Sequence, residues 1–340
     1  MKKLVKLCMA VAMVGALATQ VYAEKTAKIK ADVRSYFRQT SDKAGGGDAV
    51  SKMDMMTYTR LGASISNKGT AWTGSATVLH TFSYDGSTSN RDRYINLKND
   101  TLAIRYGYFY WGDAAHGCDY CWQSPSWGAG GNAFGNRDDQ LRISLPAQNV
   151  NFVLGMNADS ATYDNGGTDA SYTKNTMNIG VTWSDDVMEG LNLGVVYQSK
   201  SQSNANDTVG NAPDGDSNSE FGFGLTYTID PKMRVSFNYD SWTMKSGDAD
   251  ALSNSAMDFI FDMDMDDVSG LSASYTMKTE AKSADVSNSY TGLGVNYKTN
   301  IADSDVEAWV SYYQTSDKDD SDGAEANSSS LLELLLRMAF

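Results

Sequence analysis

The last ten residues of the chain, Leu331–Phe340, have the sequence LLELLLRMAF. Every second residue from Leu332 to Phe340 is apolar, whereas Glu333 and Arg337 occupy alternate positions. Because successive side chains of a β-strand point to opposite faces, this pattern predicts a strand with one apolar face and one charged face. A soluble protein rarely ends on such a strand. A β-barrel in a lipid bilayer does, because its outside meets hydrocarbon and its inside meets water.

The first 23 residues have the three parts of a secretory signal peptide. Three lysines lie within the first six residues, an apolar run follows from Leu7 to Ala18, and Val21-Tyr22-Ala23 offers a small-x-small cleavage site. The apolar run is shorter than the roughly 20 residues that a transmembrane helix needs. We therefore expect cleavage after Ala23 and one mature domain, residues 24–340.

The rest of the chain is acidic and polar. The full sequence has a net charge of −14, and the loss of the three lysines in residues 1–23 makes it −17. Recognition of phosphates needs a cationic surface, so this charge argues against nucleic acid as a partner. The mature chain has no other long apolar run, which predicts that it contains no transmembrane helix.

Alternation recurs along the whole mature chain. In the segment from Lys28 to Arg38, for example, charged residues take one phase and apolar residues the other. Between Phe221 and Ile229, large apolar residues alternate with glycine and threonine. Many of these rows begin or end on an aromatic residue, as at a membrane–water boundary. A soluble β-sandwich remains the alternative, with its apolar rows turned towards a core.

Sixteen strands are predicted, connected alternately by short turns and by longer polar stretches, as in outer-membrane barrels. The long stretches are 39–52, 112–138, 159–172, 201–217, 245–254 and 316–327. The expected strands are 28–38, 53–65, 71–84, 92–97, 101–111, 139–145, 150–158, 173–184, 190–200, 218–229, 233–244, 255–263, 269–279, 287–299, 305–315 and 329–340. The segment 255–263 has the weakest pattern, and without it the count changes by two, since a single-chain barrel needs an even number. Sixteen strands enclose a lumen wide enough for water, so the barrel is expected to be a pore.

The signal peptide, the alternation, the rhythm of turns and loops and the terminal Phe340 together resemble the trimeric general porins of Gram-negative bacteria. The resemblance covers essentially the whole mature chain and implies an all-β transmembrane antiparallel barrel in the outer membrane. It also implies a homotrimer in contact with outer-membrane lipid and lipopolysaccharide.

In that family the third loop folds into the lumen, where its acidic residues face basic residues of the barrel. The stretch 112–138 matches that loop in position. The resemblance then implies a constriction between a basic group and an acidic loop. The basic group is Arg34, Arg38, Arg60, Arg105 and Arg142. The acidic group is Asp113, Asp119, Asp138 and Asp139. The alternative is that these are ordinary charges kept in water.

The stretch His116-Gly-Cys-Asp-Tyr-Cys121-Trp is chemically unusual. A Cys-x-x-Cys pair forms a disulfide, a redox dithiol or half of a metal site. Trp122 stands where haem attachment needs a histidine, and His116 with the two cysteines supplies only three of the four ligands of structural zinc. An exported chain reaches an oxidising compartment, so a Cys118–Cys121 disulfide is the preferred interpretation. Metal binding and free thiols remain alternatives, and we assign no metal and no cofactor.

The expected function is passive diffusion of small hydrophilic solutes and ions through a water-filled channel. The acidic net charge favours cations, whereas the arginines favour anions. The alternative is a substrate-specific porin or solute-binding barrel that uses Trp111, Trp122 and Trp127 in the third loop. An enzyme is not expected: the mature chain has only His80 and His116, and neither lies in a pattern with a nucleophile.

Overall fold

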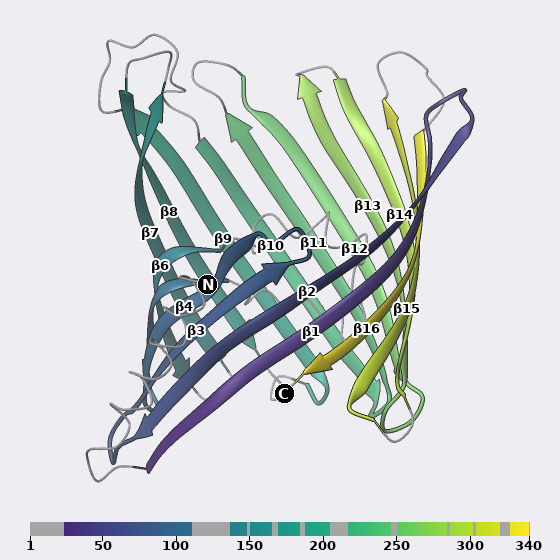
Figure 1. The fold of residues 1–340 in the computed structure, drawn as a ribbon. Helices are drawn as coiled ribbons and strands as arrows, with labels where there is room; N and C mark the ends of the chain where they lie inside the picture. Colours follow the sequence, from purple (N-terminus) through teal and green to yellow (C-terminus); the bar gives the residue numbers. More distant parts are fainter. Residues whose placement is uncertain are drawn as a thin grey trace.

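The computed structural model describes residues 24–110, 137–147, 150–164, 169–183, 188–204, 217–245, 250–283, 286–301, 304–319 and 327–339. These residues form sixteen antiparallel strands that close into one barrel (Figure 1). The strands are β1 Glu24–Lys43, β2 Ala49–Lys68, β3 Thr73–Ser83, β4 Thr88–Lys98, β5 Ala103–Tyr110, β6 Arg137–Ala147, β7 Val150–Asp164, β8 Asp169–Trp183, β9 Leu191–Asn204, β10 Ser217–Asp230, β11 Met233–Lys245, β12 Leu252–Asp264, β13 Gly270–Ser283, β14 Val286–Asn300, β15 Val306–Asp319 and β16 Asn327–Ala339.

Each strand pairs with its neighbours in the sequence, and β1 also pairs with β16. This last pairing runs from Asp32 opposite Ala339 to Lys43 opposite Ser328. Closure gives each of the sixteen described strands a hydrogen-bonded neighbour on both sides. A sheet in hydrocarbon requires such pairing, because no water is there to pair the backbone. In the described part of the chain, no helix is long and apolar enough to cross a membrane.

The strands alternate as the sequence predicts, with the apolar rows outside. In β16, Leu332, Leu334 and Leu336 are 44%, 41% and 38% exposed, whereas Glu333 and Leu335 are buried. Phe340 itself lies outside the described residues. In β14, Leu293, Val295 and Tyr297 are exposed, whereas Asn296, between the last two, is buried. The apolar rows therefore face away from the interior, which excludes the soluble sandwich.

The strand count is confirmed, including its weakest member. Residues 255–263 lie within β12, which pairs with both β11 and β13. β12 continues to Asp264, and the side chain of Asp262 is buried. The first three residues of the acidic run 262–267 are therefore strand.

The predicted long connections are shorter than expected, because paired strands extend past the apolar rows. The stretch 39–52 is mostly strand, since β1 continues to Lys43 and β2 begins at Ala49. The stretches 159–172 and 316–327 are shortened in the same way. Backbone pairing does not need apolar side chains, so hydrophobic alternation marks only the part of a strand that faces lipid.

The two ends of the barrel differ. We call the end at which β1 begins and β16 ends the turn end, and the opposite end the loop end. At the turn end, short side chains close tight turns: Asn99 accepts from the backbone N–H of Thr101 at 2.9 Å, and Asp230 from that of Lys232 at 2.7 Å. Such side-chain acceptors favour a turn over continued strand. The predicted turns at 98–100 and 230–232 are thus confirmed.

Candidate pore-lining site

Three of the predicted arginines lie together on the inner face of the barrel. Arg34 and Arg38 belong to β1, and Arg60 belongs to β2. On β1 the alternate residues Val33 and Phe37 are 37% exposed on the outer face, whereas Arg34 is 4% exposed. Strand alternation therefore turns these guanidinium groups towards the lumen and away from lipid.

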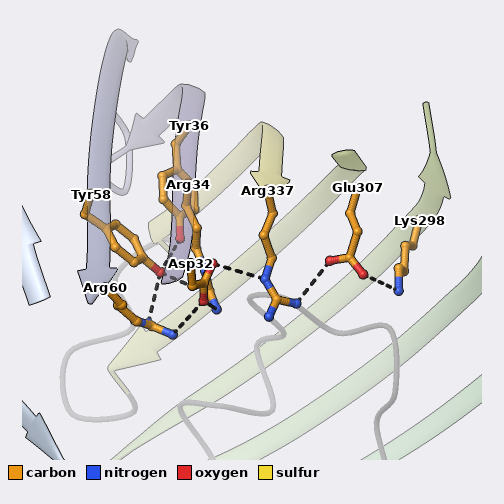
Figure 2. Close-up of polar contacts among 8 residues, drawn as sticks. All are labelled: Asp32, Arg34, Tyr36, Tyr58, Arg60, Lys298, Glu307 and Arg337. Carbon is orange, nitrogen blue, oxygen red and sulfur yellow. Dashed lines mark hydrogen bonds and ion pairs between the residues drawn. The ribbon is translucent and has the colours of Figure 1, made fainter. Parts of the chain in front are cut away.

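Asp32 is the centre of this group (Figure 2). Its carboxylate accepts hydrogen bonds from Nε of Arg34 at 2.8 and 2.9 Å and from Nη2 at 2.5 Å. Nη1 of Arg60 lies 3.5 Å from Oδ2, and Nε of Arg337 lies 3.2 Å from Oδ1. One carboxylate thus serves three arginines on three strands.

Two tyrosines hold the arginines against the barrel. The Tyr58 hydroxyl accepts hydrogen bonds from Nη1 of Arg34 at 2.9 Å and from Nη2 of Arg60 at 3.0 Å. Tyr36 donates to the same oxygen at 2.7 Å, and the two rings stack with centroids 5.4 Å apart. The Arg60 guanidinium also lies 5.0 Å from the centre of the Tyr58 ring, a cation–π contact. Because these contacts come from several sides, the positive charges are fixed in place.

The network continues around the barrel through β16, β15 and β14. Nη1 of Arg337 lies 3.0 Å from Glu307, and Nζ of Lys298 lies 2.8 Å from the same carboxylate (Figure 2). On β1, Arg38 donates to Glu333 of β16 and lies over the Tyr36 ring.

We call this set the basic face. Its members are Arg34, Arg38, Arg60, Lys298 and Arg337 with Asp32, Glu307 and Glu333. Five cations and three carboxylates leave the basic face with a positive formal charge, which attracts anions.

Arg105 and Arg142 form a second group. They stand directly opposite each other on β5 and β6. Arg105 lies 4.7 Å from the centre of the Tyr94 ring and 5.2 Å from that of Phe109, and Nε of Arg142 lies 3.3 Å from the hydroxyl of Ser144. The five predicted arginines are therefore not one cluster but two, on different parts of the barrel.

The assignment of Asp138 and Asp139 to an acidic loop is wrong. β6 begins at Arg137, so both residues belong to a strand. Asp139 shares its phase with the outward-facing Leu145, and its carboxylate binds Arg93 at 2.7 Å on the outer face. The physical reason is alternation and register: Asp139 lies on the outward phase of β6, and Tyr108 of β5 pairs with both Asp139 and Arg93, which brings these two side chains together.

The other predicted residues of the third loop lie outside the described part of the chain. These are Asp113, Asp119, Cys118 and Cys121, together with the expected fold of 112–136 into the lumen. The disulfide therefore stays a prediction.

Sequence reasoning missed five of the eight residues of the basic face. These five all occupy the polar phase of their strands, which was a usable signal that they face the lumen: Asp32, Lys298, Glu307, Glu333 and Arg337. Local sequence patterns do not show which residues of β1 and β16 pair where the barrel closes. Asp32, for example, meets Arg337 because β1 and β16 pair.

No protein-family model and no curated protein matches the sequence. Solved structures do match the fold. The anion-selective porin from Comamonas acidovorans has a TM-score of 0.67 and 14% identity, over 93% of this chain and 100% of that one. The outer membrane channel DcaP of Acinetobacter baumannii has a TM-score of 0.68 and 11% identity, over 95% and 99%. Salmonella typhi OmpF, in a complex with daunomycin, has a TM-score of 0.63 and 14% identity, over 92% and 98%.

The chain therefore has the fold of the Gram-negative porins, a sixteen-stranded barrel matched along nearly its whole length. The predicted resemblance to general porins is confirmed at the level of the fold. At these identities the likeness establishes architecture, and it does not define the solute.

Proposed function

We propose that this chain is an outer-membrane porin, a water-filled channel for passive diffusion of small hydrophilic solutes and ions. The single observation that carries the proposal is that the outer and inner faces of the closed barrel differ in polarity. Large apolar side chains lie exposed on the outside, and a network of fixed charges lines the inside. A closed barrel with an apolar exterior is stable in hydrocarbon, and a charged interior is stable only when it meets water.

The location and assembly follow from the same proposal. Residues 1–23 act as a signal peptide that is removed, and the mature barrel then spans the outer membrane in contact with lipopolysaccharide. We propose a homotrimer. One of the matched structures, OmpT of Vibrio cholerae, is described as a trimer form, which supports this expectation for a barrel of the same fold.

We further propose that the pore has a constriction at the level where its charged side chains are held in place. We propose that Arg34, Arg38 and Arg60 belong to the constriction, supported by their tight packing against Tyr36 and Tyr58. Asp32, Glu307 and Arg337 then extend the same charged surface. No catalytic step is proposed, and the alternative of a solute-binding third loop concerns residues outside the described part of the chain.

Planar-bilayer recording tests the function. The purified protein, refolded in detergent and added to a bilayer in KCl solution, is expected to insert as discrete conductance steps with a linear current–voltage relation. A correctly folded barrel, verified by its heat-dependent migration on a mild detergent gel, that gives no steps contradicts the proposal.

A further inference from the structure

The first eight residues of β1 pair with only one neighbouring strand. β1 pairs with β2 along its whole length, whereas its pairing with β16 begins only at Asp32, opposite Ala339. Within the described residues, the edge of Glu24–Ala31 that faces away from β2 therefore has no backbone partner. Figure 1 shows β1 continuing in this way beyond the end of β16. We call the segment Glu24–Ala31 the open edge.

Side-chain exposure on β1 changes where β16 ends. Val33 and Phe37 on the outer face are each 37% exposed, and they lie opposite Met338 and Leu334 of β16. Ile29 lies on the same face beyond the end of β16 and is 75% exposed. At about 3.3 Å per residue, the open edge is about 25 Å long. It is therefore long enough to pair with a complete additional strand.

The open edge is basic. It contains three lysines, Lys25, Lys28 and Lys30, and a single acidic residue, Glu24. Lys28 and Lys30 are exposed on the inner face of the strand, and neither forms an ion pair with a described carboxylate. Every cation of the basic face, by contrast, has a carboxylate partner. The open edge thus keeps a positive charge that the protein itself does not neutralise.

The open edge lies beyond the lipid-facing row of β16. That row pairs with residues 33–39 of β1, whereas the open edge ends at Ala31. Lysines occupy both of its faces, since Lys25 shares the outer face with Ile29 and Lys28 lies on the inner face. A lysine is unfavourable on a face in contact with hydrocarbon, so this segment lies in water at the turn end. In the proposed outer membrane that end faces the periplasm, as short turns do in such barrels.

The chemistry of the open edge defines what can pair with it. An unpaired edge in water accepts an extended segment of another chain, because both carry unpaired N–H and C=O groups. Lysines on an edge oppose the addition of basic or apolar strands, which leaves the edge accessible to acidic ones. A complementary strand places acidic side chains beside Lys28 and Lys30 and apolar side chains beside Ile29.

We propose that the open edge is a docking site for an extended acidic segment of a periplasmic protein, which adds to β1 as a further strand. Backbone hydrogen bonds along Glu24–Ala31 provide the affinity, and the lysines select for acidic residues. The compartment of the partner rests on the proposed outer-membrane location. The docking itself does not depend on conductance through the barrel.

Fluorescence anisotropy of a labelled peptide tests the docking. The probe consists of four Glu-Val repeats, and it is expected to bind the folded barrel in nonionic detergent at low ionic strength. The variant Lys28→Glu, Lys30→Glu is expected to weaken binding by about tenfold or more, because two attractions become repulsions. The control variant Lys43→Glu, Lys52→Glu makes the same charge change at the loop end of the same two strands, and it is expected to bind like the unmodified protein.

Two further measurements separate strand addition from simple attraction between charges. A peptide with the same side chains but with every backbone amide N-methylated lacks the N–H donors, so it is expected not to bind. Hydrogen exchange is expected to slow in the backbone amides of Glu24–Ala31 when the unmethylated peptide is bound. Equal binding of the two peptides, or unchanged exchange in this segment, overturns the docking site.

The remaining outcomes are also decisive. Absence of peptide binding to the folded, unmodified barrel overturns the proposal. Binding in detergent that disappears in bilayer discs containing phosphatidylglycerol shows that lipid headgroups occupy the edge, and it contradicts a protein partner. If the Lys28→Glu, Lys30→Glu variant fails to fold, the N-methylated peptide still decides on the unmodified protein. A barrel that binds the peptide without conducting overturns the pore alone, and a conducting barrel that does not bind it overturns the docking site alone.

Discussion

Replacement of Asp32 by Asn is expected to destabilise the barrel by about 2 kcal/mol and to shift its ion preference towards anions. The amide keeps the shape of the side chain but removes the charge that Arg34, Arg60 and Arg337 share. Removal of one partner from a buried ion pair costs about 3–5 kcal/mol, and the partial exposure of these groups to lumen water reduces that figure. Urea unfolding in detergent micelles, monitored by tryptophan fluorescence, measures the stability.

The matched control is Asp54→Asn, which removes the same charge from the same pair of strands. Asp54 pairs with Lys52 at 3.0 Å, where the side chains are 40% and 71% exposed. Exposed pairs contribute about 0–1 kcal/mol, so this variant is expected to unfold close to the unmodified protein. Equal unfolding of the two variants would show that Asp32 does not hold the arginines.

Replacement of Gly107 by Ala is expected to cost about 3 kcal/mol or more, or to prevent β4 and β5 from pairing. Gly107 lies in β5 with φ +129°, a conformation that residues with a Cβ rarely adopt. An added Cβ would lie 2.3 Å from the backbone oxygen of Arg93 and 2.9 Å from Cα of Tyr94. Both contacts are with backbone, so the strands themselves would have to move apart.

Gly74→Ala is the control for this change. Gly74 lies in β3 with no heavy atom within 4 Å of an added Cβ, so the substitution is expected to be nearly neutral. The measurement is the temperature at which each folded barrel converts to the slower-migrating unfolded form on a detergent gel. A Gly107→Ala barrel as heat-resistant as the Gly74→Ala barrel would contradict the account of β5.

Alternation was sufficient to predict the strands, their number and which side chains face the lumen. It works because lipid and water act on opposite faces of one strand, so the pattern is local and strong. Arg34, Arg38 and Arg60 were found in this way. The ends of the strands were not, because pairing beyond the apolar rows, as from Gln39 to Lys43, leaves no hydrophobic signal.

Contacts between residues of different strands were not predictable from the sequence of each strand alone. Arg38 and Glu333 are 295 residues apart in the chain, and they meet only because β1 closes on β16 in one register. A shift of that register by one residue would turn every side chain of one strand to the other face. The inner faces of β10, β11 and β12 depend on register for the same reason: Glu220, Asp240 and Asp258 become diagonal neighbours only when these strands are paired.

Charged thiol labelling during bilayer recording tests the central claim most directly, because it asks which face of a strand meets water. Ser64 and Ile65 are neighbours in β2 and therefore point to opposite faces of the strand. Ser64 lies on the same face as Arg60, which points into the lumen. Ile65 lies on the same face as Ala63, which pairs with the outward-facing Ile29. Each is replaced by cysteine in a mature chain whose Cys118 and Cys121 are changed to serine. The account predicts that a charged methanethiosulfonate reduces the current through the Ser64→Cys pore and leaves the Ile65→Cys pore unchanged. Block of the Ile65→Cys pore alone, or equal block of both, would contradict it.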